Sequence, residues 1–388
     1  MSMRDSISAD RLPGLDLLRA VAISWVMIYH CSLFDLVSQD TWVVRFGWMG
    51  VDLFFVLSGF LIAGQLLRPW ARGERPRYAR FAVRRLLRTL PAYLAIVALY
   101  FVFPVIRDRD HIQPLWQFLT FTQNFGLQTD PPKAFSHAWS LCVEEQFYLV
   151  FPITVALIAA RPSARAVIAV ITAVLLAGML VRGYFWLHDV ASRPFDPSAE
   201  PRFEPYMTLI YYPTWSRLDG LLAGIAAAIV QVFRPDWWGA LLKRSNLVLA
   251  AGIAGIAVTA SFFHGQIAGF LAATFGFPLL AGSMALVVIA GSDSRSVIGR
   301  YSIPGAGMLA TGAYSLYLSH KIVLHAVAEV AHGLPSRAVA LALALVGALV
   351  VGAALYWLVE RPFLRLREHL TNAARKTQAQ PAAAIMQA

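Results

Sequence analysis

Apolar residues run along this chain in long blocks, separated by short segments rich in arginine, proline and glycine. Several blocks reach the roughly 20 residues that an α-helix needs to cross the hydrocarbon core of a bilayer. The blocks and their boundaries predict ten helices, over residues 15–34, 47–67, 92–106, 140–160, 166–187, 213–233, 247–263, 269–290, 309–331 and 338–359. The pattern therefore predicts an all-α fold, a polytopic transmembrane helix bundle of roughly ten spans.

Composition agrees with a membrane protein and argues against two other classes, a nucleic-acid-binding protein and a protein built on disulfides or a metal site. Hydrophobic residues make up 58% of the 388 residues and charged residues 14%, which is more apolar than a soluble domain. The net charge of +11 suggests nucleic acid at first, but the basic residues cluster between apolar blocks, where they set topology. We expect no nucleic-acid partner. Cys31 and Cys142 lie in or beside apolar blocks, so we expect no disulfide framework and no metal site.

The distribution of positive charge predicts the orientation of the chain. A cytoplasmic N-terminus places most of the 33 Lys and Arg residues on the cytoplasmic side, as the positive-inside rule requires. The densest basic segment, residues 68–88, falls on that side, and both termini are then cytoplasmic. We expect one transmembrane domain over residues 1–366 and a basic to polar disordered tail over residues 367–388.

The first predicted span carries two ionisable residues, Arg19 and His30, whose transfer into a bilayer costs free energy. They are separated by about 11 steps of 100°, so both side chains lie on one helix face, and Asp16 lies on the same stripe. Ionisable groups inside a span usually face a cavity or a partner. A topology-setting arginine and a packed histidine are the alternatives, but histidine is the side chain best suited to proton transfer near neutral pH. We therefore interpret the pair as candidate catalytic residues.

Three carboxylates are further candidates. Asp52, in the second span, is expected at the depth of His30, where it either orients the imidazole or caps a helix. Glu144 and Glu145 begin the fourth span. Adjacent helical residues point about 100° apart, so we expect at most one of the two to face the cavity of His30, and helical spacing favours Glu144.

Arg84, Arg85 and Arg88 precede the third span, with Arg84 and Arg88 one helical turn apart. Arginine clusters bind phosphate through forked, charge-assisted hydrogen bonds, which suits a phosphorylated donor such as coenzyme A. Positive-inside charge or binding of anionic lipid is the alternative. Deeper in the predicted bundle, Arg217, Asp219 and Lys321 require partners or water, and a structural ion-pair role fits them at least as well as chemistry.

These blocks resemble the acyltransferase 3 family of integral-membrane sugar acyltransferases. The resemblance covers nearly the whole chain and rests on these elements in this order: Arg19 and His30 with ten residues between them, Gly50 to Phe60, Arg84-Arg85 to Pro91, Trp139 to Tyr148, Arg217-Leu218-Asp219-Gly220, and Tyr314 to His320. One departure is Cys142, where relatives often have serine. No further domain follows the tenth predicted span, so we expect the stand-alone form.

The resemblance implies transfer of an acyl group, commonly acetyl, from cytoplasmic acyl-CoA to a carbohydrate hydroxyl at the outer face of the bacterial inner membrane. His30 then acts as general base on the acceptor or is transiently acylated. The expected partners are acyl-CoA, a carbohydrate acceptor and membrane lipid. Two rival hypotheses remain at this stage: a proton-coupled transporter or flippase of a glycan or lipid-linked substrate, since buried ionisable groups also form proton relays, and a non-catalytic scaffold.

Overall fold

The computed structural model describes residues 12–74, 76–194, 201–263 and 269–370, and in these ranges it is helical and without strands. Its long helices are α1 (Pro13–Ser32), α3 (Met49–Ala71), α4 (Tyr78–Val102), α6 (Trp139–Ala160), α7 (Ala164–Phe185), α9 (Asp219–Phe233), α11 (Ser245–Phe263), α12 (Phe277–Gly291), α13 (Ala306–Val330) and α14 (Arg337–Leu355). The shorter elements are α2 (Trp42–Arg45), η1 (Pro104–Ile106), α5 (Leu115–Leu119), η2 (Ser136–Ala138), η3 (Trp186–Val190), α8 (Phe203–Pro205), η4 (Tyr206–Tyr211), η5 (Thr214–Ser216), α10 (Pro235–Lys243), η6 (Ala272–Gly276), η7 (Ala331–Gly333) and η8 (Tyr356–Glu360).

Each of the ten predicted ranges overlaps one of these long helices, and eight helices are long and apolar enough to cross a membrane. The two others are α9, which has only 15 residues, and α13, whose hydropathy is lowered by buried polar residues such as Ser319, His320 and Lys321. A polar residue on an inward face lowers hydropathy without forbidding burial.

The structure corrects the starts of two predicted helices. The third helix begins at Tyr78, well before residue 92. Its first turns carry arginines at helical spacing and lie before the apolar block, so hydropathy does not reveal them. The helix predicted from residue 213 begins at Asp219, because the short turn Thr214–Ser216 precedes it. Arg217 therefore lies in a buried turn and outside the helix.

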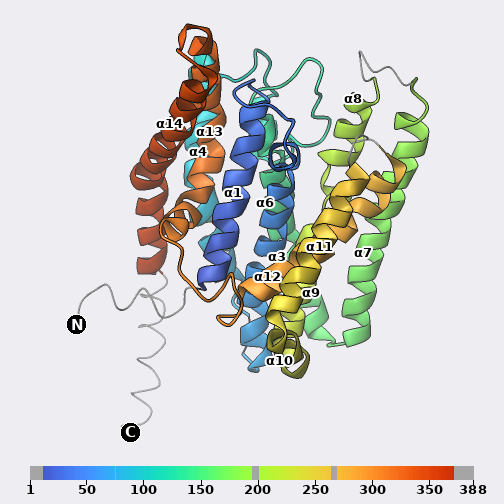
Figure 1. Cartoon of the computed structure of the whole chain (residues 1–388). Helices are drawn as coiled ribbons and strands as arrows, with labels where there is room; N and C mark the ends of the chain where they lie inside the picture. Colours follow the sequence, from blue (N-terminus) through green and yellow to red (C-terminus); the bar gives the residue numbers. More distant parts are fainter. Residues whose placement is uncertain (1–11, 75, 195–200, 264–268, 371–388) are drawn as a thin grey trace.

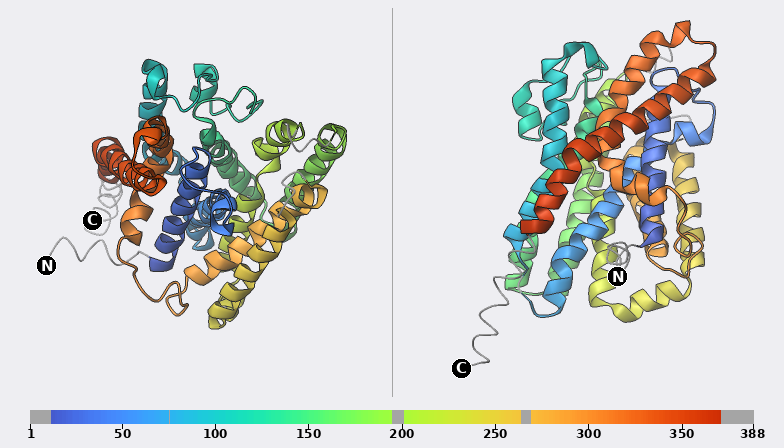
Figure 2. Two further views of the ribbon diagram at one scale, coloured as in Figure 1. Left: turned by 45° about the horizontal axis from the view of Figure 1, so that its top comes forward. Right: turned by 90° about the vertical axis from the view of Figure 1, so that its left-hand side faces the viewer.

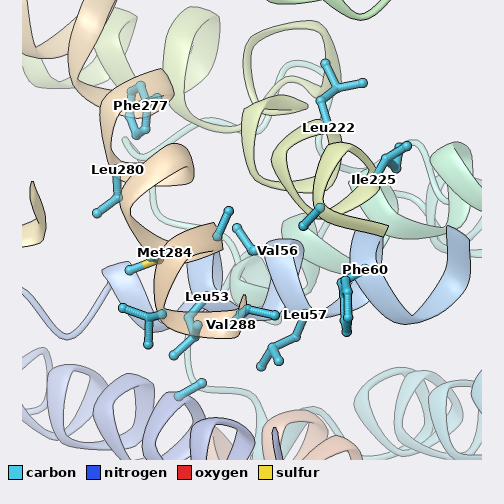
Figure 3. Close-up of a cluster of buried hydrophobic side chains, with 14 of the residues drawn as sticks. Leu53, Val56, Leu57, Phe60, Leu222, Ile225, Phe277, Leu280, Met284 and Val288 are labelled. Carbon is cyan, nitrogen blue, oxygen red and sulfur yellow. The ribbon is translucent and has the colours of Figure 1, made fainter. Parts of the chain in front are cut away.

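The core forms where α3 meets α9 and α12. In the most apolar part of α3, 78% of the residues are buried. Figure 3 shows Leu53, Val56 and Phe60 of α3 in one buried apolar cluster with Leu222 of α9 and Met284 of α12. Gly59 of α3 and Gly224 of α9 allow this contact, because a Cβ atom on Gly224 would lie 2.2 Å from the carbonyl oxygen of Val56.

Other helices surround this core. In Figure 1, α7 lies at one edge of the bundle and α14 at the opposite edge, with α1 and α3 between them. Only 6% of the most apolar stretch of α7 is buried. This helix therefore presents its side chains outward, as a lipid-facing helix does. Figure 2 shows α14 crossing the bundle obliquely.

The first helix begins and the last helix ends toward the same side, the lower one in Figure 1. The arginine-bearing start of α4 lies at that side too. The last helical stretch, which begins at Arg337, continues to Leu370. Most of the predicted C-terminal tail, residues 371–388, lies outside the described residues.

Candidate functional site

A polar cavity of about 620 Å³ lies among α1, α3, α4, α6 and α13. Its lining includes five of the eight residues singled out in the sequence, which are Arg19, Arg84, Arg85, Arg88 and Glu144. Residues far apart in the chain thus meet around one space. The lining includes the exposed side chains of Arg84 and Gln65, so the cavity reaches the surface at the start of α4.

The arginines of the cavity differ in their partners. Arg88 donates to Glu360 at 2.5 Å, and Glu360 is 1% exposed, so the charge of Arg88 is already neutralised. The guanidinium of Arg85 stacks 5.0 Å from the ring centre of Tyr148. Arg84 is exposed and has no hydrogen bond or ion pair within the described ranges. Arg84 is consequently the arginine of this group best placed to bind an incoming anion.

Arg19 lines the same cavity and donates to Asp16 at 3.2 Å. The two residues lie on one stripe of α1, as the periodicity predicted. This pair keeps a positive group beside the arginines of α4 and partly balances it with a carboxylate.

The two adjacent glutamates are in different surroundings. Glu144 lines the cavity and accepts a hydrogen bond of 2.7 Å from the Tyr148 hydroxyl, which also contacts Ser58. Glu145 is half-buried and is not among the described residues that line the cavity. The structure therefore places Glu144 at this space and not its neighbour.

The inner end of the cavity is formed by Ser140 and Tyr317. The Tyr317 hydroxyl donates to the backbone carbonyl of His137 at 2.6 Å and lies 2.6 Å from Ser140 Oγ. These contacts connect α13 to the start of α6. They also join the cavity to a group of buried histidines.

Three histidines from three helical elements form that group, which we call the histidine cluster: His30, His137 and His320. The ring centres of His30 and His320 are 4.9 Å apart, and those of His137 and His320 are 5.1 Å apart. His30 is 9% exposed, His137 3% and His320 0%. Nε2 of His320 lies 2.8 Å from Nδ1 of His30. Within the described residues, no group of three or more His, Cys, Asp and Glu side chains could hold a metal ion.

Asp52 lies in the first turn of α3, and its contact is with an arginine. Its carboxylate accepts from Arg217 at 2.9 Å, and within the described residues no hydrogen bond joins it to His30. Arg217 is 1% exposed, and a buried guanidinium needs a counter-charge. The partner of the His30 imidazole is another imidazole.

The remaining buried charges are paired, as the sequence required. Arg182 donates to Asp219 at 2.8 Å, and Lys321 lies 2.7 Å from Asp108 in the segment between α4 and α6. Burial alone would raise the pKa of Asp108, but the Lys321 ammonium and hydrogen bonds from Phe135 and Tyr100 lower that pKa to about 2. Lys321 thus anchors this segment over the histidine cluster.

Sequence reasoning gave no role to His137, His320 or Glu360. His320 carries the same signal as His30, because it too is an ionisable residue in an otherwise apolar helix. Glu360 follows the last apolar block, where a carboxylate looks like the start of a polar tail. Its contact with Arg88 joins residues 272 positions apart, and no local pattern reports such a contact.

The fold and the site together are those of a membrane helix bundle with a polar cavity beside buried imidazoles. A family model described as an acyltransferase domain, that of acyltransferase 3, matches residues 12–357. The chain therefore belongs to the acyltransferase 3 family. No solved structure matches it.

Three relatives extend this result. The chain is 28% identical over 335 residues to O-acetyltransferase OatA of Staphylococcus aureus, covering 80% of this chain and 50% of the relative. It is 29% identical to the putative peptidoglycan O-acetyltransferase YrhL of Bacillus subtilis, covering 56% and 33% of the two chains, and 28% identical to the peptidoglycan O-acetyltransferase OatA of Listeria monocytogenes, covering 57% and 34%. The chain spans half of the first relative's length and about a third of the other two.

Proposed function

We propose that this protein is a membrane-bound O-acyltransferase that moves an acyl group, acetyl in our assignment, from acyl-CoA to a hydroxyl of a cell-surface or exported glycan. The observation that carries the proposal is the arginine-lined cavity, whose inner end adjoins the histidine cluster through Ser140 and Tyr317. The names of the O-acetyltransferase relatives support the same reaction. The names of two of them support a glycan as acceptor.

The cavity suits a donor with a phosphorylated head and a narrow arm. Arg84 lies at its mouth without a partner among the described residues, and Arg85 and Arg19 add positive charge along its wall. Forked hydrogen bonds from arginine bind phosphate oxygens well. In this proposal the phosphates of acyl-CoA bind at Arg84, and the pantetheine arm extends toward Tyr317.

The reaction needs a base close to the acceptor hydroxyl. The hydroxyl oxygen attacks the thioester carbonyl carbon, His30 takes the hydroxyl proton, and the carbon–sulfur bond breaks. The proton on His30 then passes to the departing thiolate, so the products are an ester and free coenzyme A. An acylated His30 is the alternative route, and mass spectrometry of the acid-quenched protein distinguishes the two.

Location and topology complete the proposal. We assign the protein to the bacterial plasma (inner) membrane, with roughly ten spans and both ends of the chain in the cytoplasm. The concentration of arginine at the start of α4 supports this orientation. The donor then enters from the cytoplasm, and the acceptor meets His30 from the outer side.

Mass spectrometry of surface glycans tests this function in cells. Cells that express the protein should carry an acyl ester on a glycan, which cells without the gene and cells with a His30→Ala variant should lack. The variant must insert in the membrane at normal level. An unchanged glycan profile in all three strains would rule out the proposed transfer and favour the scaffold or transporter hypothesis.

A further inference from the structure

The hydrogen bonds of His320 determine where its proton lies. Nδ1 of His320 lies 3.1 Å from the carbonyl oxygen of Leu316 and 2.8 Å from that of Tyr317. A carbonyl oxygen only accepts hydrogen bonds, so Nδ1 must carry the hydrogen. In a neutral ring the other nitrogen, Nε2, is then a lone-pair acceptor.

Neutrality of the pair follows from its surroundings. His320 is fully buried and His30 nearly so, and a buried charge is costly unless it is paired. The nearest positive group is Lys321, the next residue in α13, and the carboxylate of Asp108 is already paired with it. A second positive charge at this place would lack a counter-ion.

The proton on His320 fixes the tautomer of His30. Nε2 of His320 accepts, and it lies 2.8 Å from Nδ1 of His30, so Nδ1 of His30 must donate. Nε2 of His30 is left with a free lone pair, and no hydrogen bond to it is made by the described residues. His137 does not compete, because its Nε2 lies 3.1 Å from the carbonyl oxygen of Tyr317 and donates to it.

We propose that His320 is a positioning residue that holds His30 as the Nδ1–H tautomer and so makes Nε2 of His30 the reactive nitrogen. Its catalytic meaning rests on the proposed acyl transfer, whereas the tautomer itself does not. The arrangement follows the logic of a base oriented by a third group, with a neutral imidazole in the place usually taken by a carboxylate. His320 itself touches neither donor nor acceptor in this account.

Three variants separate positioning from packing. His320→Ala removes the acceptor, whereas His320→Gln brings an amide oxygen that accepts from Nδ1 of His30. His325→Gln is the matched control, because His325 is on the same helix and contacts Glu329 at 3.8 Å outside the cluster. His30→Gln assigns the signals of His30.

The first readout does not depend on catalysis. Solid-state NMR of ¹⁵N-histidine-labelled protein in lipid bilayers should show a protonated Nδ1 and an unprotonated Nε2 on His30. The same tautomer should persist in His320→Gln and in His325→Gln and should become mixed in His320→Ala. A protonated Nε2 on wild-type His30, or an unchanged spectrum in His320→Ala, would overturn the proposal.

The second readout is acetyl transfer by the same preparations. His320→Ala should lower kcat on the order of 10²-fold with the donor KM unchanged, and His320→Gln should recover roughly tenfold or more of that loss. Equal losses in both variants would contradict a positioning role. Absence of transfer by the wild-type protein would contradict the proposed function alone, and the tautomer claim would then be decided by the NMR spectra.

Discussion

Glu144 and Glu145 are neighbours in sequence, yet only Glu144 is found at the cavity and receives the Tyr148 hydroxyl. The difference arises because adjacent helical side chains diverge by about 100°. We expect Glu144→Gln to lower kcat/KM for transfer roughly tenfold, since the amide replaces the carboxyl group that lies beside the substrates in the proposed reaction. Glu145→Gln should stay within about threefold of wild type. Steady-state kinetics on matched amounts of protein check this, and the reverse order would contradict the placement.

Arg84 allows a test of the proposed phosphate contact. It lines the cavity without a described partner, while Arg88 is held by Glu360. We expect Arg84→Gln to raise the KM for acyl-CoA about tenfold or more and to leave kcat nearly unchanged, since one charge-assisted phosphate contact is lost. Arg77→Gln is the control, because Arg77 is exposed and is not among the described cavity residues. Equal effects of the two substitutions would indicate general positive charge and no specific phosphate site.

Helical periodicity in the sequence predicted which side chains share one face of a helix. The shared face of Arg19 and Asp16 follows from spacing, and their contact confirms it. The pairing of His30 with His320 joins residues 290 positions apart, and the partner of Asp52 comes from a turn 165 residues away. Such tertiary contacts leave no local pattern, so the sequence could not identify Arg217 as the partner of Asp52 or His320 as the partner of His30.

At the scale of elements, the contact of α3 with α9 sets the position of both helices. Gly224 approaches the backbone of Val56 so closely that a methyl group has no room. We expect Gly224→Ala to lower the stability by about 1–3 kcal/mol, because the helices must separate.

Gly282 provides the matched control for this prediction. It lies in α12, and a Cβ atom there meets nothing within 4 Å. Gly282→Ala should therefore leave the unfolding temperature unchanged or slightly higher, since alanine favours helix. Thermal unfolding of both variants in the same detergent measures the difference. A stable Gly224→Ala protein would show that α3 and α9 do not meet at this residue.

Element boundaries show which features of the fold were predictable. Apolar blocks located all ten long helices, because burial in lipid selects them directly. The start of α4 was missed since its first turns are rich in arginine, and the start of α9 was missed since Pro213 and Trp215 extend the apolar block without continuing the helix. A hydropathy profile therefore misses helical turns whose side chains are polar. It also assigns to a helix those turns whose side chains are apolar.

For the whole molecule, the orientation that we propose in the membrane rests on the arginines at one side. Asp236, in α10, and Asp110, between α4 and α6, are both exposed and are expected on opposite sides of the membrane. In intact cells, a membrane-impermeant maleimide should label Asp110→Cys and leave Asp236→Cys unlabelled until the membrane is opened. The native cysteines Cys31 and Cys142 are buried and give a low background. Labelling in the reverse pattern would invert the proposed topology.

The most direct test of the central claim is transfer across a defined membrane. Purified protein is reconstituted into vesicles, acetyl-labelled acetyl-CoA is supplied at the face bearing Arg84, and an acceptor glycan is supplied at the opposite face. We expect label on the glycan with wild-type protein and none above background with His30→Ala. Equal labelling by the two proteins would contradict the assignment of His30 as the group that makes the transfer possible.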